Sequence, residues 1–454
     1  MGSIPTGSIN KKWWGEVEGS NPSGSTWLAY KWAEKGFWPR FFIEKRKEND
    51  IIQVKMAKKL TIEKVLERGV VEILPDKKSF LNLAKKRKLK IYFGIDPTSP
   101  NLHLGHFVPL KKLAEFQQLG HETILLIGDF TAQIGDPSGR DKKREPLTQE
   151  QVQRNMKNYK AQLSKVLNLS KTKIAYNSRW LAKMGLKDVL ELASHFTVSR
   201  LLERDMFQER LKKGQEVWVS EMLYPLLQGY DSVALDVDLE IGATDQKFNM
   251  LVGRKLQKIY RKREKFVLTV PLLLGLDGRK MSKTYNNTVN LTDPPNEMFG
   301  KIMSLKDELI FEYFRLLTDV PEKEVINMEE AVKEGKLNPR DAKEKLALEI
   351  VTFFWGEDKA LQAKKEFIKV FREKEIPEDI PNFFSPKTSY PILDLLIYLH
   401  LANSKSEAKR LIKQGGVKID KVVVKDPKIV VEVKEGMVIQ VGKRKFARLT
   451  YDDQ

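Results

Sequence analysis

The chain contains 454 residues, of which 41% are hydrophobic and 31% are charged. It has no cysteine, which excludes disulfide bonds, thiolate metal sites and a cysteine nucleophile. No apolar run approaches the ~18 residues that a membrane-spanning helix needs, and the first residues lack the apolar core of a secretion signal. We therefore expect a soluble, cytoplasmic protein. At roughly 100–200 residues per domain, the length predicts two to four domains.

Basic side chains outnumber acidic ones, with 80 Lys and Arg against 61 Asp and Glu, and the formal net charge is +19. Such a surplus favours a polyanionic partner such as a nucleic acid, although a merely basic surface gives the same count. Because the chain has only five histidines and no cysteine, we expect no structural zinc site.

Residues 1–55 differ in composition from everything that follows. They hold five of the eight tryptophans, are interrupted throughout by Gly, Ser and Pro, and show neither helical nor strand periodicity. The helical spacing of Leu60, Val65 and Leu66 begins only after Met56. Two explanations stay open. Residues 1–55 are either a disordered extension or a falsely translated leader, in which case the cellular protein starts at Met56.

The next part of the chain has the pattern of an α/β domain. Residues 90–95 and 123–128 are short apolar runs, and residues 104–119 between them have helical spacing. Two buried strands joined by a helix indicate a parallel βαβ unit. We therefore predict a Rossmann-like, doubly wound parallel sheet in a domain of residues 56–300. The further elements predicted there are helices over 150–235, a strand at 235–241, a basic helix at 245–262 and a strand at 266–270.

Two more units are predicted after the α/β domain. Residues 301–375 are charged and helix-rich, and Asn338 is placed to cap a helix that has Pro339 in its first turn. Three prolines indicate a linker over 376–390. The predicted fold class is thus α/β, with a helical domain and then a small α+β domain. That last domain, 391–454, is predicted to hold two amphipathic helices and strands at 417–424, 429–433 and 437–441.

Two histidines stand at the junction between the first predicted strand and its helix. His103 and His106 are three residues apart, so they share one face of a helix start. A helix N-terminus after a parallel strand is a common phosphate-binding position, and two imidazoles there can donate hydrogen bonds to phosphate oxygens. Gly105 leaves space for a base or a ribose against the backbone. Two ordinary, partly exposed histidines would show the same spacing.

A polar loop with two lysines follows the last predicted strand of the sheet. Lys280 and Lys283 lie three residues apart in the run Gly-Arg-Lys-Met-Ser-Lys-Thr of 278–284. Lysines on a mobile loop can close over a triphosphate and neutralise charge as pyrophosphate departs. For a single loop of this kind, a solvated basic surface is the more common interpretation.

Taken in order, the two motifs resemble the two signatures of class I aminoacyl-tRNA synthetases. Residues 103–106 read His-Leu-Gly-His where the family usually has His-Ile-Gly-His, and 280–284 read Lys-Met-Ser-Lys-Thr for Lys-Met-Ser-Lys-Ser. Both changes are mild, since Leu keeps a packing side chain and Thr keeps the hydroxyl. Over about 57–450 the chain resembles the bacterial form of the tyrosyl-tRNA synthetases. The runs similar to tyrosyl-specific motifs are 92–98, 134–139, 224–231 and 242–246.

This resemblance implies an enzyme that activates L-tyrosine with ATP to tyrosyl-adenylate and pyrophosphate and then loads tRNA(Tyr). Mg²⁺ is implied as the companion of ATP and not as a tightly bound cofactor, and the substrate carboxylate itself attacks the α-phosphate. Tyr92 and Asp231 are implied to face the phenol, where unpaired polar groups would reject phenylalanine by ~10⁴–10⁵. The other implied tyrosine-binding residues are Asp136, Tyr224 and Gln228 for the ammonium group and Gln246 for the carboxylate.

The nucleotide is implied to lie across both signatures. The implied ATP-binding residues are Asp96, Gly105, His106, Asp245 and Lys283. The implied catalytic residues, which stabilise the α-phosphate and the departing pyrophosphate, are Thr98, His103, His106, Lys280, Lys283 and Thr284. Taken singly, each has an ordinary structural explanation, and it is their order along the chain that favours the enzyme.

The last unit resembles a small RNA-binding module shared with a small-subunit ribosomal protein. Ser404 can cap a helix rich in cations, and two glycines then turn the chain into a strand. A basic amphipathic helix facing water would look similar. In the family, the helical region that corresponds to 301–375 helps to recognise the anticodon. The implied RNA-binding residues are Lys405, Lys409, Arg410 and Lys413.

Two alternatives remain open on sequence alone. A tryptophanyl-tRNA synthetase shares the architecture, but it has no reason to pair Tyr92 with Asp231 around a phenol. A synthetase-like RNA-binding or splicing factor would not need intact signatures, whereas both are complete here. The resemblance further implies a homodimer, and we expect no association with a membrane.

Overall fold

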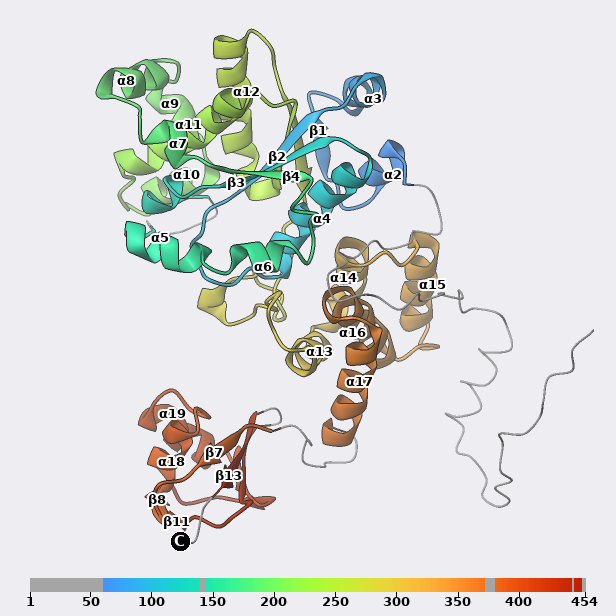
Figure 1. Ribbon diagram of the computed structural model, residues 1–454, viewed down its shortest axis with the longest axis vertical. Helices are drawn as coiled ribbons and strands as arrows, with labels where there is room; N and C mark the ends of the chain where they lie inside the picture. Colours follow the sequence, from blue (N-terminus) through green and yellow to red (C-terminus); the bar gives the residue numbers. More distant parts are fainter. Residues whose placement is uncertain (1–59, 139–143, 372–379, 443–444, 451–454) are drawn as a thin grey trace, which may run out of the picture. The chain divides into compact units, whose positions relative to one another are not determined.

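The computed structural model describes residues 60–138, 144–371, 380–442 and 445–450 (Figure 1). Both explanations for residues 1–55, and a start at Met56, concern residues outside these ranges. Among the helices of the described ranges, none is long and apolar enough to cross a membrane.

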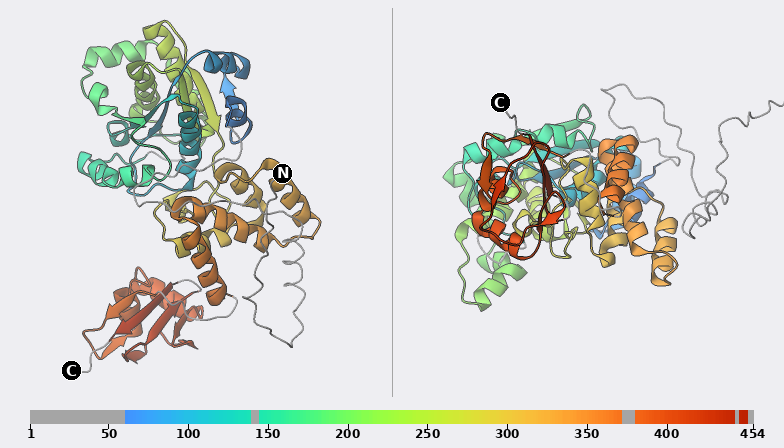
Figure 2. Two further views of the ribbon diagram at one scale, coloured as in Figure 1. Left: turned by 45° about the vertical axis from the view of Figure 1, so that its right-hand side comes forward. Right: turned by 90° about the horizontal axis from the view of Figure 1, so that it is seen from below.

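A six-stranded sheet forms the centre of the first part of the chain. Its strands are β1 (Glu72–Leu74), β2 (Lys90–Ile95), β3 (Glu122–Ile127), β4 (Thr172–Tyr176), β5 (Leu239–Ala243) and β6 (Phe266–Val270). The order across the sheet is β1-β6-β5-β2-β3-β4, and only β1 runs antiparallel to its neighbour. Helices lie on both sides of the sheet (Figures 1 and 2). The predicted doubly wound α/β fold is confirmed, with β1 as an additional antiparallel edge strand.

Two sequence predictions within this sheet are corrected. β4 lies in the stretch 150–235, for which only helices are predicted, because its five residues, Thr-Lys-Ile-Ala-Tyr, are too few and too polar for a clear strand signal. The strand predicted at 235–241 starts at Leu239. The preceding helix continues to Leu235, and Asp236 ends it in a left-handed conformation with φ of 52°.

Eleven helices and two 3₁₀ turns accompany these strands in the described ranges. They are α2 (Ile62–Glu67), α3 (Lys77–Lys86), α4 (Leu104–Gln118), η1 (Thr131–Gln133), α5 (Gln149–Met156), α6 (Tyr159–Leu163), α7 (Ser178–Leu181), α8 (Leu186–Ser194), α9 (Val198–Leu202), α10 (Asp205–Lys212), α11 (Val219–Leu235), η2 (Thr244–Gln246), and α12 (Lys247–Arg261). Ile91 and Phe93 of β2 join the core that includes α4. Tyr92, between them, points to the opposite face and packs with Leu235 and Val237.

Five helices follow the sheet along the chain. They are α13 (Pro295–Met303), α14 (Ile310–Leu317), α15 (Glu322–Lys333), α16 (Pro339–Trp355) and α17 (Glu357–Phe371), with 3₁₀ turns η3 (Lys283–Tyr285) and η4 (Asp307–Leu309). Asn338 accepts a hydrogen bond of 2.9 Å from the Arg340 backbone, so the predicted cap of α16 is confirmed. The boundary predicted after residue 300 falls inside α13.

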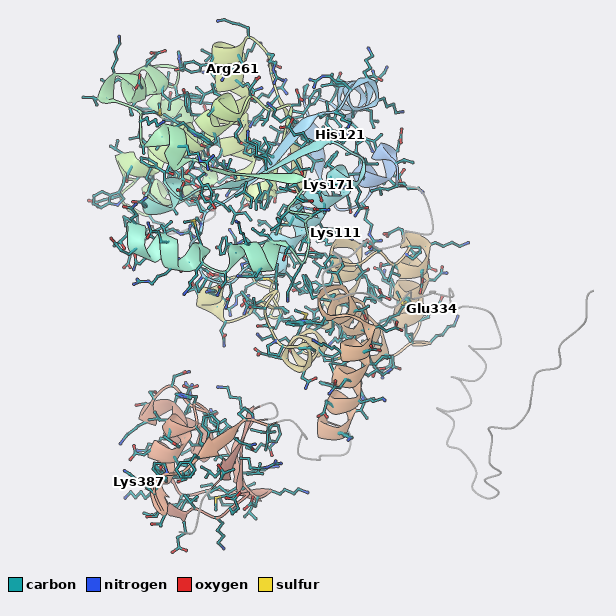
Figure 3. All side chains as sticks on the ribbon, viewed as in Figure 1. Lys111, His121, Lys171, Arg261, Glu334 and Lys387 are labelled. Atoms are coloured by element: carbon teal, nitrogen blue, oxygen red, sulfur yellow. The ribbon has the colours of Figure 1, made fainter. Side chains whose placement is uncertain are left out.

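These helices share a core with the sheet. One continuous cluster of buried side chains extends from α2 through α4 to α17. At the end of α14, Arg68 donates hydrogen bonds to three backbone carbonyls, those of Phe314, Arg315 and Val320. Lys111 of α4, labelled in Figure 3, forms an ion pair of 2.8 Å with Asp319. The helical part is therefore attached to the sheet by both apolar and polar contacts.

Residues 380–450, within the described ranges, have a core of their own. A five-stranded sheet of order β10-β9-β12-β13-β7 and a strand pair β11-β8 are accompanied by α18 (Ile392–Tyr398) and α19 (Lys405–Lys413). The strands are β7 (Asn382–Phe384), β8 (Ser389–Pro391), β9 (Val417–Ile419), β10 (Val422–Val423), β11 (Val430–Glu432), β12 (Val438–Val441) and β13 (Lys445–Thr450). The linker expected over 376–390 is corrected, because β7 pairs with the distant β13 and β8 with β11; residues 376–379 lie outside the described ranges.

Candidate active site

Both motif histidines lie at the first turn of α4. The Gly105 backbone N–H donates a hydrogen bond of 3.1 Å to His103 Nδ1, and the His103 backbone N–H donates one of 3.2 Å to His106 Nδ1. Because Nδ1 accepts in each ring, a neutral imidazole carries its proton on Nε2; this tautomer follows from the hydrogen-bond pattern. Burial lowers the pKa of His103 well below its usual value and the pKa of His106 to about 4. At neutral pH, each ring is an uncharged Nε2–H donor.

The lysine loop packs against this helix start. A Cβ placed on Gly105 would lie 2.9 Å from the His103 ring and 3.8 Å from Sδ of the buried Met281, so a side chain at this position would crowd the histidines. Lys280 forms an ion pair of 2.7 Å with Asp245, which follows β5. The two motifs, about 175 residues apart in the sequence, are thus neighbours at one end of the parallel strands.

Asn287 fixes the shape of the lysine loop. Its Oδ1 accepts a hydrogen bond of 2.8 Å from the Ser282 backbone, and Ser282 in turn caps the 3₁₀ turn that holds Lys283 and Thr284. After burial and the neighbouring imidazole, the charges of Lys283 and Lys280 contribute to lowering the pKa of His103. Both ammonium groups therefore lie within electrostatic reach of the histidine pair.

Asp96, directly after β2, is held by two hydroxyl groups. Thr131 Oγ1 and the Tyr224 hydroxyl each donate a hydrogen bond of 2.8 Å, one to each carboxylate oxygen. Burial raises the pKa of Asp96 to about 7, and the nearby charge of Asp136 contributes in the same direction. Asp96 is therefore poised to change its protonation state near neutral pH.

Asp231 of α11 is 1% exposed and is held by one residue of α7 and by the residue directly before that helix. The Trp180 indole N–H donates a hydrogen bond of 2.8 Å to Asp231 Oδ1, and the Asn177 amide donates one of 3.3 Å to Oδ2. Burial raises the pKa of Asp231 to about 8 against these two donors. Burial raises the pKa of Tyr92 well above its usual value, and the charge of Asp231 adds to this rise. The two groups therefore lie close enough to interact electrostatically.

Amide side chains connect the remaining predicted residues. Gln246 donates a hydrogen bond of 2.7 Å to Asp136 Oδ2, and Asn249 of α12 donates to the oxygens of Gln228 and Gln246 across 2.7 Å and 3.2 Å. The Tyr92 hydroxyl shares a hydrogen bond of 2.8 Å with Ser232 Oγ. The structure thus brings the predicted tyrosine-binding residues into one region, with hydrogen bonds between α11, α12 and the ends of the strands.

Some predictions have weaker support, and some residues of the site were missed. The side chains of Thr98 and Thr284 form no hydrogen bond with another described residue. Asn177 directly follows the parallel strand β4, at the sheet edge where open α/β sheets bind ligands. This position would have indicated Asn177 as a site residue if β4 had been recognised, but the sequence of β4 gives no clear strand signal. The residues that sequence reasoning missed are Thr131, Asn177, Trp180, Ser232 and Asn249.

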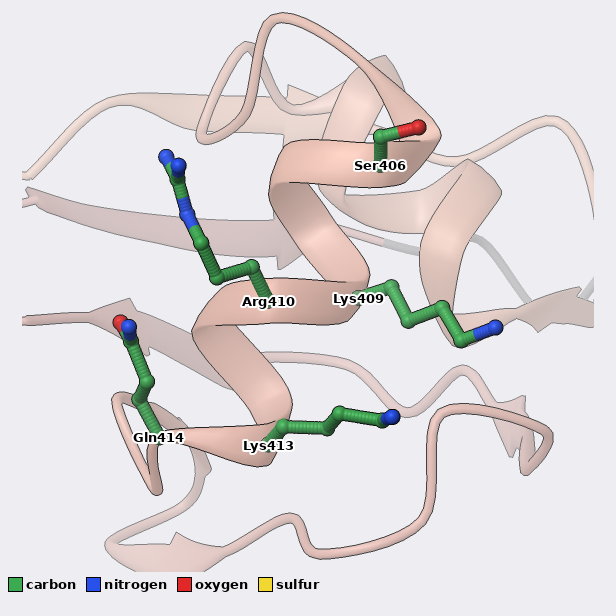
Figure 4. A pocket seen from close by; sticks show the side chains of 5 residues that line it. All are labelled: Ser406, Lys409, Arg410, Lys413 and Gln414. Atoms are coloured by element: carbon green, nitrogen blue, oxygen red, sulfur yellow. The ribbon is translucent and has the colours of Figure 1, made fainter.

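The predicted RNA-binding residues lie on α19. Ser404 accepts a hydrogen bond of 3.2 Å from the Glu407 backbone, which confirms the predicted helix cap. Lys405 pairs with Asp394 across 2.5 Å and does not line the neighbouring shallow pocket. That pocket, seen in Figure 4, is lined by Ser406, Lys409, Arg410, Lys413 and Gln414.

Comparison with known proteins adds to this geometry. Residues 84–372 match the family "tRNA synthetases class I (W and Y)", and residues 393–439 match the S4 domain. The tyrosine–tRNA ligase of Thermotoga maritima is 49% identical over 388 residues, which cover 85% of this chain and 96% of the relative. The tyrosine–tRNA ligase of Moorella thermoacetica is 46% identical over 391 residues, 85% and 95% of the two chains.

Solved structures agree with the fold. A C-terminally truncated mitochondrial tyrosyl-tRNA synthetase of Coccidioides posadasii matches with a TM-score of 0.55 and 26% identity, covering 66% of this chain and 90% of that one. The corresponding Aspergillus nidulans protein matches with a TM-score of 0.57 and 24% identity, covering 68% and 93%. Because the Aspergillus nidulans protein is only 24% identical, its similarity to this chain shows the fold alone.

Proposed function

We propose roles for the individual residues of the site, starting from the premise that the chain belongs to the bacterial-type tyrosyl-tRNA synthetases of class I. Its function is therefore the ATP-dependent ligation of tyrosine to tRNA. The observation that carries the residue assignment is the buried carboxyl group of Asp231, held by Trp180 and Asn177 and electrostatically coupled to the Tyr92 hydroxyl. A phenol placed between Tyr92 and Asp231 finds one donor and one acceptor.

The remaining tyrosine-binding roles follow from donor and acceptor chemistry. The ammonium group needs acceptors, which Asp136, the Tyr224 oxygen and the Gln228 amide oxygen provide. Gln246 can donate an N–H hydrogen bond to the substrate carboxylate; without substrate, this N–H group donates to Asp136. Bound tyrosine would thus replace hydrogen bonds that these side chains make among themselves.

Activation needs charge stabilisation around the triphosphate and no protein nucleophile. His103 and His106 supply two neutral Nε2–H donors at a helix N-terminus, the end of a helix that attracts phosphate. Lys280 and Lys283 supply positive charge from the facing loop, and we assign Thr98 and Thr284 to the same phosphates as hydroxyl donors. The ribose and base are assigned to Asp96, Gly105 and Asp245.

Mg²⁺ is proposed to enter with ATP. The side chains assigned to the phosphates are cations, N–H groups and hydroxyls, whereas Mg²⁺ prefers carboxylate, phosphate and water oxygens. The ion would therefore be held mainly by the phosphates and would neutralise part of their charge.

The proposed location is the cytoplasm, which fractionation of the source cells would test.

Amino-acid-dependent ATP–pyrophosphate exchange, run with each standard amino acid and without tRNA, tests the assignment. We expect exchange with tyrosine alone. Asp231→Asn should lower tyrosine-dependent exchange strongly, because an amide NH2 group, which donates, replaces one of the two acceptor oxygens of the carboxylate. Exchange with tyrosine that is unchanged in Asp231→Asn would refute the placement of the phenol.

RNA recognition is assigned to two regions. The helices within 301–375 are proposed to recognise the anticodon. On α19, we assign Lys409, Arg410 and Lys413 to RNA phosphates, with a smaller contribution from Lys405 because it is paired with Asp394.

We also propose a homodimer that uses the surface between α8 and the start of α11. Six large apolar side chains are exposed within 34 consecutive residues there, including Leu186 at 76% and Val219 at 70%. Such a concentration is typical of an interface. Asp in place of Leu186 and Leu190 should give a monomer in light scattering, whereas Leu361→Asp, at an exposed site on α17, should leave the dimer intact. A dimer that survives the double substitution would refute this surface.

A further inference from the structure

A fully buried ion pair lies next to Tyr92. Lys265, directly before β6, is 0% exposed and forms a salt bridge with Glu240 of β5. Lys265 Nζ lies 2.6 Å from Ser232 Oγ, and Ser232 Oγ lies 2.8 Å from the Tyr92 hydroxyl. Gly253 of α12 leaves room for this contact, since a Cβ there would lie 2.8 Å from both Lys265 Nζ and Ser232 Oγ.

Counting protons gives the direction of this chain of hydrogen bonds. An ammonium group can only donate, so Lys265 donates to Ser232 Oγ, and Ser232 has one proton left to give. Its two other oxygen neighbours are the Tyr92 hydroxyl at 2.8 Å and Glu240 Oε2 at 3.4 Å. Hydroxyl hydrogen bonds are normally about 2.7–2.8 Å long, and Glu240 Oε2 is already paired with Lys265. On these distances we assign the Ser232 proton to Tyr92 and not to Glu240, which leaves the proton of Tyr92 for a ligand.

We propose that Lys265 is a positioning residue that fixes this direction, so that Tyr92 donates to the substrate phenol while Asp231 accepts from it. The inference rests on the proposed tyrosine site. A phenol gives one proton and accepts another, which matches a donor facing an acceptor. If the chain were reversed, Tyr92 would present its oxygen beside Asp231 as a second acceptor. Such a site fits a group with two N–H donors better than it fits a phenol.

The test measures ATP–pyrophosphate exchange with tyrosine, phenylalanine and 4-aminophenylalanine. In Lys265→Met, Glu240 becomes the strongest acceptor near Ser232 and the chain reverses. We expect the tyrosine-to-phenylalanine ratio of kcat/KM to fall about tenfold or more. Phenylalanine use should stay unchanged, and the ratio of 4-aminophenylalanine to tyrosine should rise.

Ser232→Ala breaks the chain without reversing it. It should lower the tyrosine-to-phenylalanine ratio less than Lys265→Met does, and adding Lys265→Met to it should change neither ratio further. A purely structural role predicts instead that the use of all three amino acids falls together and that the effects of the two substitutions add. Either of these results overturns the proposal.

Ser232→Ala and one further variant, Tyr92→Phe, ensure that the test has a definite outcome. Because Ser232→Ala removes only one hydroxyl, it carries the test if Lys265→Met does not fold, and an unchanged ratio in Ser232→Ala overturns the proposal. Tyr92→Phe separates this inference from the proposed function. If Tyr92→Phe lowers the ratio while the Lys265 and Ser232 variants do not, the tyrosine site stands and the inference falls. Absence of tyrosine-dependent exchange in the unaltered protein would remove both.

Discussion

Trp180 donates its indole N–H to the carboxyl group of Asp231 across 2.8 Å. Even with this donor, burial raises the pKa of Asp231 from its usual value of 3.8 to about 8. The folded protein therefore keeps a proton that the unfolded chain loses at lower pH. The stability that this protonated group contributes is complete below about pH 3.8 and is lost as the pH rises to about 8.

Asp231→Asn should reveal this loss, because an amide does not ionise. The free energy of unfolding of Asp231→Asn, relative to the unaltered protein, should increase by about 1.4 kcal/mol per pH unit between the two pKa values and stay constant above pH 8. Denaturant unfolding without tyrosine, repeated across this pH range, measures it. Parallel stability curves for the two proteins would contradict the raised pKa.

The two nitrogens of His106 should have separable roles. Its Nδ1 accepts from the His103 backbone, whereas Nε2–H is assigned to the phosphate. His106→Asn can keep the first contact, so it should leave the melting temperature unchanged and lower the exchange rate about 100-fold. His106→Gln can keep the Nε2 donor, so it should retain more activity but lose about 1 kcal/mol of stability with the helix cap. The opposite ranking of the two variants would exclude this division of roles.

The histidines should not appear in the pH–rate profile. Burial places the pKa of His106 near 4 and that of His103 well below its usual value, so both rings stay neutral from mildly acidic pH upward. We expect His106→Gln and the unaltered protein to have pH–rate profiles of the same shape, with any inflection near neutral pH assigned to Asp96, whose pKa is about 7. An inflection that disappears in His106→Gln would show that the ring titrates in the working range.

The three cations that line the pocket on α19 should make tRNA binding salt-dependent. Alanine at Lys409, Arg410 and Lys413 should weaken tRNA binding, and each lost phosphate contact should reduce the slope of log K against log salt by about 0.7–0.9. Lys405→Ala should have a smaller effect because its ammonium group already pairs with Asp394. Filter binding over a range of salt concentrations gives these slopes, circular dichroism verifies that each variant is folded, and tRNA-independent exchange verifies that its catalytic part is unaffected. An unchanged slope in the triple variant would place the RNA elsewhere.

Arg68 should contribute strongly to stability. Its guanidinium group donates to three carbonyls around the end of α14, which would lose these partners in Arg68→Met. We expect a loss of about 3 kcal/mol in the free energy of unfolding. Lys85→Met is a matched control, because Lys85 is 59% exposed in its ion pair with Glu63 and should contribute less than about 1 kcal/mol. Equal losses in both variants would contradict this role of Arg68.

Local patterns in the sequence predicted the central elements well. β2, β3, β6 and α4 have apolar runs or helical spacing that need no distant partner to be recognised. β7 was missed because its pairing with β13, more than 60 residues away, has no local signature. In the site, motif residues such as Asp231 were predicted from the resemblance, whereas Trp180 was not, because its partnership with Asp231 exists only after the chain has folded.

Lys280 and Asp245 form an ion pair, and under the proposed roles this pair would link recognition of the two halves of ATP. Under the proposed roles, a ribose takes the carboxylate of Asp245 and a triphosphate takes the ammonium group of Lys280. Intact ATP provides a new partner for both side chains when it binds, so neither the Asp245 carboxylate nor the Lys280 ammonium group is left unpaired. Adenosine would take the carboxylate of Asp245 and leave the ammonium group of Lys280 without a partner. Free pyrophosphate would take the ammonium group of Lys280 and leave the carboxylate of Asp245 without one. With these roles, the site would discriminate against fragments of its nucleotide through a contact that exists before any ligand binds.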